Sequence, residues 1–169
     1  MQPLITEPTI LPLAQQGEKV LTQIAQAIVD PLQPEIQTLI QDMHATLLAA
    51  NGVGIAAPQV FQSLRIIIVA SRPNPRYPDA PLMEAVAMIN PEIIWQSSET
   101  CLGEEGCLSV QGIRAPVARA EHLTVRYLNP QGETVEAEYS GFVARIIQHE
   151  VDHLNGVLFV ERVGKQHDD

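Results

Sequence analysis

The segment QHEVDH, residues 148–153, places two histidines and a glutamate on one turn of a predicted helix. Residues four apart in a helix lie on nearly the same face, so His149 and His153 can direct their rings toward one metal ion. Glu150 stands beside that face, where its carboxylate can accept a proton from a water molecule on the metal. Two histidines do not complete a metal site, so the pattern predicts a third ligand elsewhere in the chain.

The helix that carries this segment is expected to begin near Ser140-Gly141 and to end at Asn155-Gly156. Its apolar residues form a broad face, which predicts that most of the helix is buried. These residues are Phe142, Val143, Ile146, Ile147 and Leu154. Polar side chains on a buried helix need partners, and a metal ion would supply one for the two histidines.

The remaining elements predict an α+β fold. Residues 34–50 have apolar side chains at helical spacing between Pro34 and the stop signal Asn51-Gly52, which predicts an N-terminal helix. Strands are expected at residues 64–69, 86–95, 122–128 and 133–139, the last two joined by a turn. The proline-rich residues 71–81 predict a loop. We therefore expect one domain over residues 1–169, with antiparallel strands around a central buried helix.

Charge and composition exclude several classes of protein. A net charge of -10 argues against direct nucleic-acid binding, which needs clustered lysine and arginine. The sequence contains no run of about 18 apolar residues, so we do not expect a membrane span. Residues 1–9 lack the positive charge of a secretory signal. We expect a cytoplasmic protein. In a reducing compartment, Cys101 and Cys107 are expected to be buried, metal-bound or reactive rather than paired in a disulfide.

Two further segments stand out, GVGIAAPQ at residues 52–59 and EGCLS at residues 105–109. Glycines at 52 and 54 allow another group to approach the backbone closely. Taken alone, the first segment could equally be a functional loop or simply the end of a helix followed by an ordinary loop. Cys107 alone is also a weak signal, because a lone cysteine is usually a small buried apolar side chain.

Together with QHEVDH, these two segments resemble the three motifs of the peptide deformylase family, in the same order. The resemblance runs from about Glu35 to Val160. It implies a metal-dependent hydrolase that removes the formyl group from the N-terminal formylmethionine of newly made polypeptides and releases formate.

The resemblance also implies roles for individual residues. Cys107, His149 and His153 match the metal ligands, and three such ligands leave an open fourth position for water. Glu150 matches the general base and acid, while the Gln59 amide and the Leu108 backbone N–H match donors to the formyl oxygen. The remaining matches are the cleft residues Val53, Gly54 and Gly106, and the positions Glu105 and Arg114. An ion pair of Glu105 with Arg114 would hold the Cys107 loop in place, and the alternative is a solvated surface pair that contributes little. Phe142 and Ile146 are expected either to wall the pocket for the methionine side chain or simply to belong to the core.

The metal and the partners follow partly from this resemblance. A Cys-His-His site suits zinc, iron, cobalt and nickel, so the spacing does not select one. The family implies one Fe(II) per chain, with zinc, nickel or cobalt as substitutes. The expected substrates are N-formylmethionyl nascent peptides, which a monomer would meet near the ribosome. Some family members dock there through a long basic C-terminal helix, which we do not expect in this chain.

Three other functions remain compatible with the motifs. A zinc endopeptidase would take its third ligand from downstream, where Glu161 and His167 are the candidates. A peptide-binding or metal-binding module without catalysis would require neither Glu150 nor Gln59. An acyltransferase would use Cys107 as a nucleophile. The segment before the first helix departs from the common family pattern, and the long 71–81 loop is expected to border the cleft.

Overall fold

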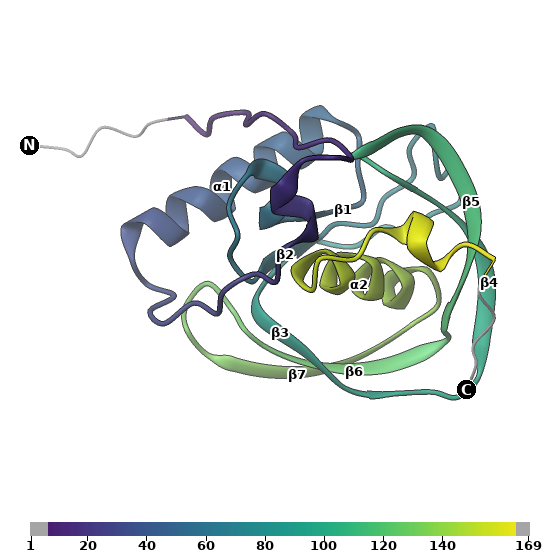
Figure 1. The fold of residues 1–169 in the computed structure, drawn as a ribbon. Helices are drawn as coiled ribbons and strands as arrows, with labels where there is room; N and C mark the ends of the chain where they lie inside the picture. The colour runs from purple at the N-terminus through teal and green to yellow at the C-terminus, as the bar shows by residue number, and fades with distance from the viewer. Residues whose placement is uncertain (1–6, 165–169) are drawn as a thin grey trace, which may run out of the picture.

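The computed structural model describes residues 7–164 and contains two antiparallel sheets (Figure 1). The larger sheet has five strands in the order β1-β2-β3-β6-β7. These strands are β1 (Gly54–Ala56), β2 (Ile66–Val69), β3 (Val86–Gln96), β6 (His122–Leu128) and β7 (Thr134–Ser140). The smaller sheet pairs β4 (Thr100–Cys107) with β5 (Val110–Ala120).

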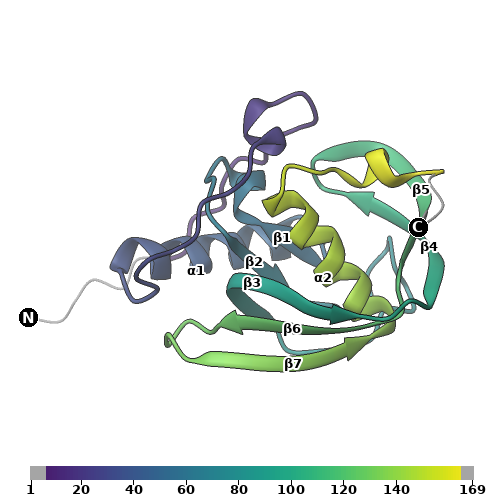
Figure 2. The same cartoon turned by 60° about the horizontal axis from the view of Figure 1, so that its bottom comes forward.

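Two α-helices pack against opposite faces of the five-stranded sheet. They are α1 (Pro34–Ala49) and α2 (Gly141–Leu154). Strand β2 shows why both faces are covered: Ile66 and Ile68 pack in the core cluster with α1, whereas Ile67 and Val69 pack in the cluster with α2. Alternate residues of a strand point to opposite faces, so an unbroken apolar strand requires cover on both sides. Figure 2 shows α2 lying across one face of this sheet.

Three short 3₁₀ helices complete the described chain, namely η1 (Lys19–Thr22), η2 (Ala57–Val60) and η3 (Phe159–Arg162). Helix η2 follows β1 directly, and η3 follows α2 and contacts β4 and β5. No helix within residues 7–164 has both the length and the apolar character that crossing a membrane requires.

Helix α2 carries an unusual number of buried polar side chains. Gln148, His149, Glu150, Asp152 and His153 are all buried. Gln148 is fully paired: its amide oxygen accepts a hydrogen bond from the Ala120 N–H at 2.9 Å, and its amide nitrogen donates to the Ala120 carbonyl at 2.9 Å. This reciprocal pair fixes α2 against β5 and removes the cost of burying the amide.

The antiparallel strands and the two helices agree with the coarse fold class expected from the sequence, and the helix bounds agree within about two residues. Strands β1, β4 and β5 were not predicted. The segment of β4 contains two glycines and two glutamates, and β5 contains Gly112 and Pro116, so neither has the composition of a strand. Cys107 consequently ends a strand, and the expectation that it lies in a loop is wrong.

Gly156, which follows α2, lies close to the backbone of Thr22 and Gln23 in the N-terminal segment and provides a stability test. Its φ is +76°, and a Cβ atom there would lie 2.7 Å from the carbonyl oxygen of Thr22. We predict that Gly156→Ala lowers the free energy of unfolding by about 2–4 kcal/mol, because left-handed strain adds to a backbone clash. Urea denaturation of the metal-free protein measures this loss.

The matched control is Gly132→Ala, where φ is +83° but the nearest atom, Pro31 Cγ, would lie 3.7 Å from the added Cβ. In Gly132→Ala, left-handed backbone strain alone should lower the free energy of unfolding by about 1 kcal/mol. Equal losses in the two variants would show that the close approach to Thr22 does not contribute.

Candidate metal centre

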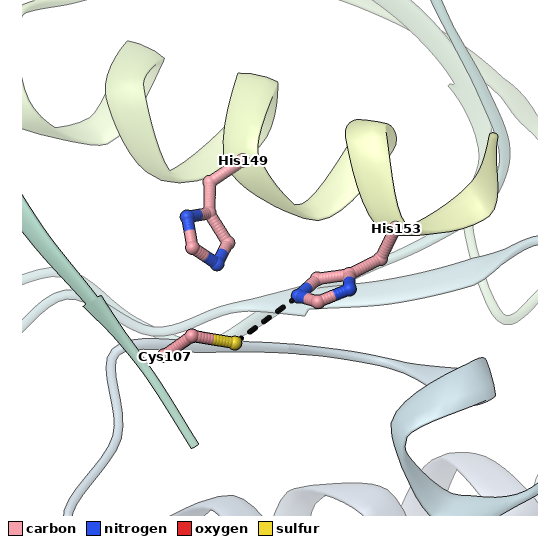
Figure 3. A group of neighbouring side chains, drawn as sticks. All are labelled: Cys107, His149 and His153. Carbon is pink, nitrogen blue, oxygen red and sulfur yellow. Dashed lines mark hydrogen bonds between the residues drawn. The ribbon is translucent and has the colours of Figure 1, made fainter. Parts of the chain in front are cut away.

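Strand β4 and helix α2 bring Cys107, His149 and His153 together (Figure 3). One ligand atom from each residue lies within 4.8 Å of the other two, and all three residues are buried. The Cys107 sulfur lies 3.4 Å from Nε2 of His153, and the two imidazole rings are 5.1 Å apart between centroids. Figure 3 shows both histidines pointing from α2 toward the cysteine.

The chemistry of this donor set fits a divalent metal ion. Burial opposes ionisation of Cys107, but the charge of His153 and the hydrogen bonds from both histidines hold the pKa of the thiol well below its usual value. The Ser109 N–H and the Gln59 amide also lie 3.4 Å and 3.6 Å from the sulfur. A thiolate with two imidazoles is a donor set for zinc, iron, cobalt or nickel, and metal binding displaces the protons that these groups hold.

The carboxylate of Glu150 lies beside the three donors. Its Oε1 atom is buried and has no hydrogen-bond partner among the residues described. Burial raises the pKa of Glu150 to about 7. A carboxyl group with a pKa near neutrality can both accept and return a proton in a reaction at physiological pH. Gly54 makes room for this side chain, because a Cβ there would lie 2.7 Å from the other carboxylate oxygen.

Gln59 presents an amide N–H to the same centre. It lies on η2, and its Oε1 accepts a hydrogen bond from the Ala56 N–H at 2.9 Å. This bond orients the amide so that Nε2 faces the Cys107 sulfur and lies 3.1 Å from Oγ of Ser109. A fixed amide donor of this kind is suited to stabilising negative charge on a substrate oxygen. Leu108, the other expected donor, directly follows Cys107, and its carbonyl accepts a bond from Gln15 at 3.2 Å.

A cleft opens beside the three donors and contains the other residues expected to bind substrate. These are Val53, Gly54, Gly106, Phe142 and Ile146. Ile146 lines this cleft and also belongs to the core cluster. The 71–81 loop borders the cleft through Arg76 and Tyr77. The Tyr77 hydroxyl accepts a hydrogen bond from the Gly106 N–H at 3.0 Å, and its ring lies 4.9 Å from that of Phe142.

The expected ion pair between Glu105 and Arg114 is wrong. Arg114 instead pairs with Glu104, at 2.9 Å between Nε and Oε1, and both of these side chains reach solvent. Adjacent residues of a strand point to opposite faces, so Glu104 faces outward and Glu105 faces inward. The side chain of Glu105 is only 3% exposed.

Glu105 is instead the centre of a buried charge network. Its carboxylate lies 2.8 Å from Nε of Arg119, 2.7 Å from Nη1 of Arg145 and 2.9 Å from Nδ1 of His149. Although burial opposes ionisation, the hydrogen bonds and charges of Arg119 and His149 hold the pKa of Glu105 well below its usual range. An ionised carboxylate can only accept, so Nδ1 of His149 carries a proton, and Nε2 is the nitrogen that can exchange its own proton for a metal.

The sequence interpretation missed Arg119, Arg145 and Asp152, which belong to this network. Arg145 lies four residues before His149 and Asp152 three residues after it, so helical spacing placed both near the first histidine. Arg119 gave no comparable signal, because it belongs to the unpredicted strand β5.

The downstream ligands that a zinc endopeptidase would require are not provided by the described chain. Glu161 accepts a hydrogen bond from the Leu158 N–H at 2.7 Å and so caps η3. His167 lies outside the residues that the structure describes. The third donor comes from upstream, from Cys107.

Comparisons with known proteins agree on one family. The family model described as polypeptide deformylase matches residues 10–169. Peptide deformylase 2 of Nostoc sp. is 53% identical over 156 residues, which cover 92% of this chain and 87% of that protein. Peptide deformylase 2 of Shewanella oneidensis is 48% identical over 152 residues, covering 90% of this chain and 83% of that protein.

Solved structures similar to this one are also peptide deformylases. The Met-Ala-Ser-bound class I type b peptide deformylase from Acinetobacter baumannii has a TM-score of 0.89 and 60% identity, covering 92% of this chain and 99% of that chain. The peptide deformylase from Thermotoga maritima has a TM-score of 0.82 and 36% identity, with the same coverage.

The buried network predicts very different effects for two adjacent glutamates. Glu105→Ala should lower the free energy of unfolding of the metal-free protein by about 3–5 kcal/mol, because Arg119 and Arg145 lose their common buried partner. Glu104→Ala, one residue earlier, should cost less than about 1 kcal/mol, because its pair with Arg114 is exposed. Chemical denaturation distinguishes the two, and a small loss in both variants would contradict the assigned network.

Proposed function

The chain belongs to the polypeptide deformylase family, and we propose that its chemistry takes place at a metal ion held by Cys107, His149 and His153. The protein is an enzyme that removes the formyl group from the N-terminal formylmethionine of newly made polypeptides and releases formate. The observation that carries the proposed site is the convergence of three buried metal donors beside Glu150, whose Oε1 has no partner among the described residues.

The metal supplies two things that these side chains cannot. A divalent ion bound there would polarise the formyl carbonyl and lower the pKa of a water molecule in its open position. We assign Fe(II), one ion per chain, on the basis of the family resemblance. Zinc, nickel and cobalt suit the same donors and are expected to substitute for it.

Glu150 moves the protons of the reaction. Its carboxylate accepts a proton from the water that attacks the formyl carbon, and the carbonyl becomes tetrahedral. Glu150 then donates that proton to the peptide nitrogen as the carbon–nitrogen bond breaks. Formate and a free N-terminal amine are the products. Glu150 is buried, and its Oε1 has no hydrogen-bond partner within residues 7–164, which supports this role.

Gln59 and Leu108 act on the formyl oxygen. The Gln59 amide, oriented by its bond to the Ala56 N–H, donates a hydrogen bond to this oxygen as negative charge develops. The Leu108 backbone N–H is the second donor, since Leu108 directly follows Cys107. Gln59 lies on η2 and Leu108 in the tight turn between β4 and β5, so both donors are in place before charge develops.

The cleft accounts for recognition of the peptide. Phe142 and Ile146 receive the methionine side chain, and Val53, Gly54 and Gly106 contact the peptide backbone. These five residues line the same cleft as Cys107, His149 and Glu150, which supports this assignment. The similar deformylase from Acinetobacter baumannii binds Met-Ala-Ser, a tripeptide with the sequence of a deformylated product.

We also propose a domain organisation, an oligomeric state and a cellular location for this protein. Residues 1–169 form one catalytic domain with α2 as its central helix, and this domain acts as a monomer in the cytoplasm on nascent chains. The buried packing of α2 against both sheets supports the central position of the helix. A net charge of -10 gives no support to direct docking on ribosomal RNA.

Glu150→Gln tests the reaction and the role of Glu150 together. Iron-loaded protein, purified anaerobically, should release formate from formyl-Met-Ala-Ser, and the variant should lose about 100-fold to 10,000-fold in rate while keeping its metal. Glu104→Gln is the control, because that carboxylate is exposed and pairs with Arg114. Full activity of Glu150→Gln would exclude Glu150 as the general base and favour a nucleophilic Cys107.

Metal analysis tests the assignment of iron. Protein prepared anaerobically from cells should contain about one iron per chain and lose activity when exposed to air, because Fe(II) is oxidised. Replacement of Cys107 or His149 by alanine should abolish the stoichiometric metal. Fully active protein that contains zinc alone would overturn the assignment of iron without affecting the three ligands.

A further inference from the structure

We propose that η3 positions the imidazole of His149 for metal binding, with Phe159 and Arg162 as its two positioning residues. This inference rests on the proposed function, in which His149 is a metal ligand. Helix η3 follows α2 and contacts β4 and β5, so the chain returns to the metal centre after supplying the two histidines (Figure 1).

Phe159 contacts His149 directly. Its ring is stacked on the imidazole with 5.9 Å between centroids and 25° between the planes. Phe159 is buried and belongs to the core cluster that also contains Cys107, Val110 and Val117. An offset stack against a ring that is itself fixed in the core restricts the rotation of the imidazole about its side-chain bonds.

Arg162 acts on His149 through a chain of charges that begins at Asp152. The arginine Nε lies 2.6 Å from Oδ2 of Asp152, and Nη2 lies 2.9 Å from Oδ1. This is a bidentate pair, the geometry in which an arginine fixes the plane of a carboxylate. The same Oδ2 atom accepts a bond from Nη1 of Arg119 at 2.7 Å.

The series of paired charges continues from Arg119 to the metal ligand His149. Arg119 donates from Nε and Nη2 to the two oxygens of Glu105, both at 2.8 Å. The Glu105 Oε1 atom lies 2.9 Å from Nδ1 of His149. Negative and positive groups therefore alternate from Arg162 to the imidazole. The inner members are buried, where hydrogen bonds between charges are poorly screened and strongly directional.

Within this series of charges, Arg162 fixes the orientation of the Asp152 carboxylate. Both oxygens of Asp152 are used, and within residues 7–164 Oδ1 is bonded by Arg162 alone. Removal of Arg162 frees the carboxylate to rotate, which loosens the partner that holds Arg119 and, through it, Glu105. Because Arg162 is 48% exposed, its loss leaves no large cavity. The effect on His149 can therefore be separated from a collapse of the core.

The test compares metal release from four proteins loaded with Co(II): wild type, Arg162→Ala, Arg162→Lys and Arg126→Ala. Arg126 is the matched control, since it is 47% exposed and is also paired, with Glu136 at 3.1 Å, on a strand outside the network. Release into excess chelator should be about tenfold faster in Arg162→Ala, at the lower end of the effects seen for groups behind a metal ligand. Arg162→Lys should be intermediate, and Arg126→Ala should match wild type.

The visible absorption of the bound Co(II) gives an independent readout. A reoriented imidazole should change this spectrum in Arg162→Ala at temperatures where circular dichroism shows the protein fully folded. Phe159→Leu should also accelerate release, by removing the ring stack while retaining an apolar side chain. A role limited to fastening the C-terminal segment would lower the melting temperature without changing either readout.

Two other results would be decisive. If Arg162→Ala lowers the melting temperature but releases Co(II) at the wild-type rate with an unchanged spectrum, the inference is wrong and the proposed metal site stands. If wild-type protein does not bind one Co(II), or if His149→Ala retains it, the proposed metal site fails and the inference fails with it.

Discussion

The buried carboxylate of Glu105 is the constraint on which the geometry of the metal centre depends. It joins β4 to α2 through Arg145 and His149, and it joins β4 to β5 through Arg119. A charge buried this deeply is stable only when it is paired and hydrogen-bonded. The relative placement of these three elements is therefore restricted to an arrangement that satisfies the carboxylate. Cys107 lies two residues further along the same strand, so the same restriction brings its sulfur to the histidines.

The centre is assembled from short rigid segments that are far apart in the sequence. Helix α2 supplies His149, Glu150 and His153, the end of β4 supplies Cys107, and η2 supplies Gln59. Hydrogen bonds already hold Gln59 and His149 in defined orientations. Gly54 leaves the space that the Glu150 carboxylate occupies, because any side chain there would collide with it. Preorganisation of this kind lowers the cost of stabilising charge during a reaction.

Much of the fold and of the centre was predictable from the sequence, and the failures have physical reasons. Helices α1 and α2 have strong apolar periodicity and clear stop signals, and the turn at Asn129-Pro130 marks the β6–β7 hairpin. Strands β4 and β5 are held by pairing with each other and by buried charges rather than by strand-forming side chains. Local composition does not report such interactions. The same limit explains the wrong partner for Glu105, since only strand register decides which of two adjacent glutamates faces inward.

X-ray absorption at the iron edge of the anaerobically loaded protein would identify the atoms that bind the metal. We expect an iron ion with one sulfur neighbour and two imidazole nitrogens, together with oxygen or other light atoms as the remaining neighbours. The sulfur contribution should disappear in Cys107→Ser. An iron ion with no sulfur neighbour, or a sulfur contribution that persists in Cys107→Ser, would contradict the assignment of Cys107, His149 and His153 as the metal ligands.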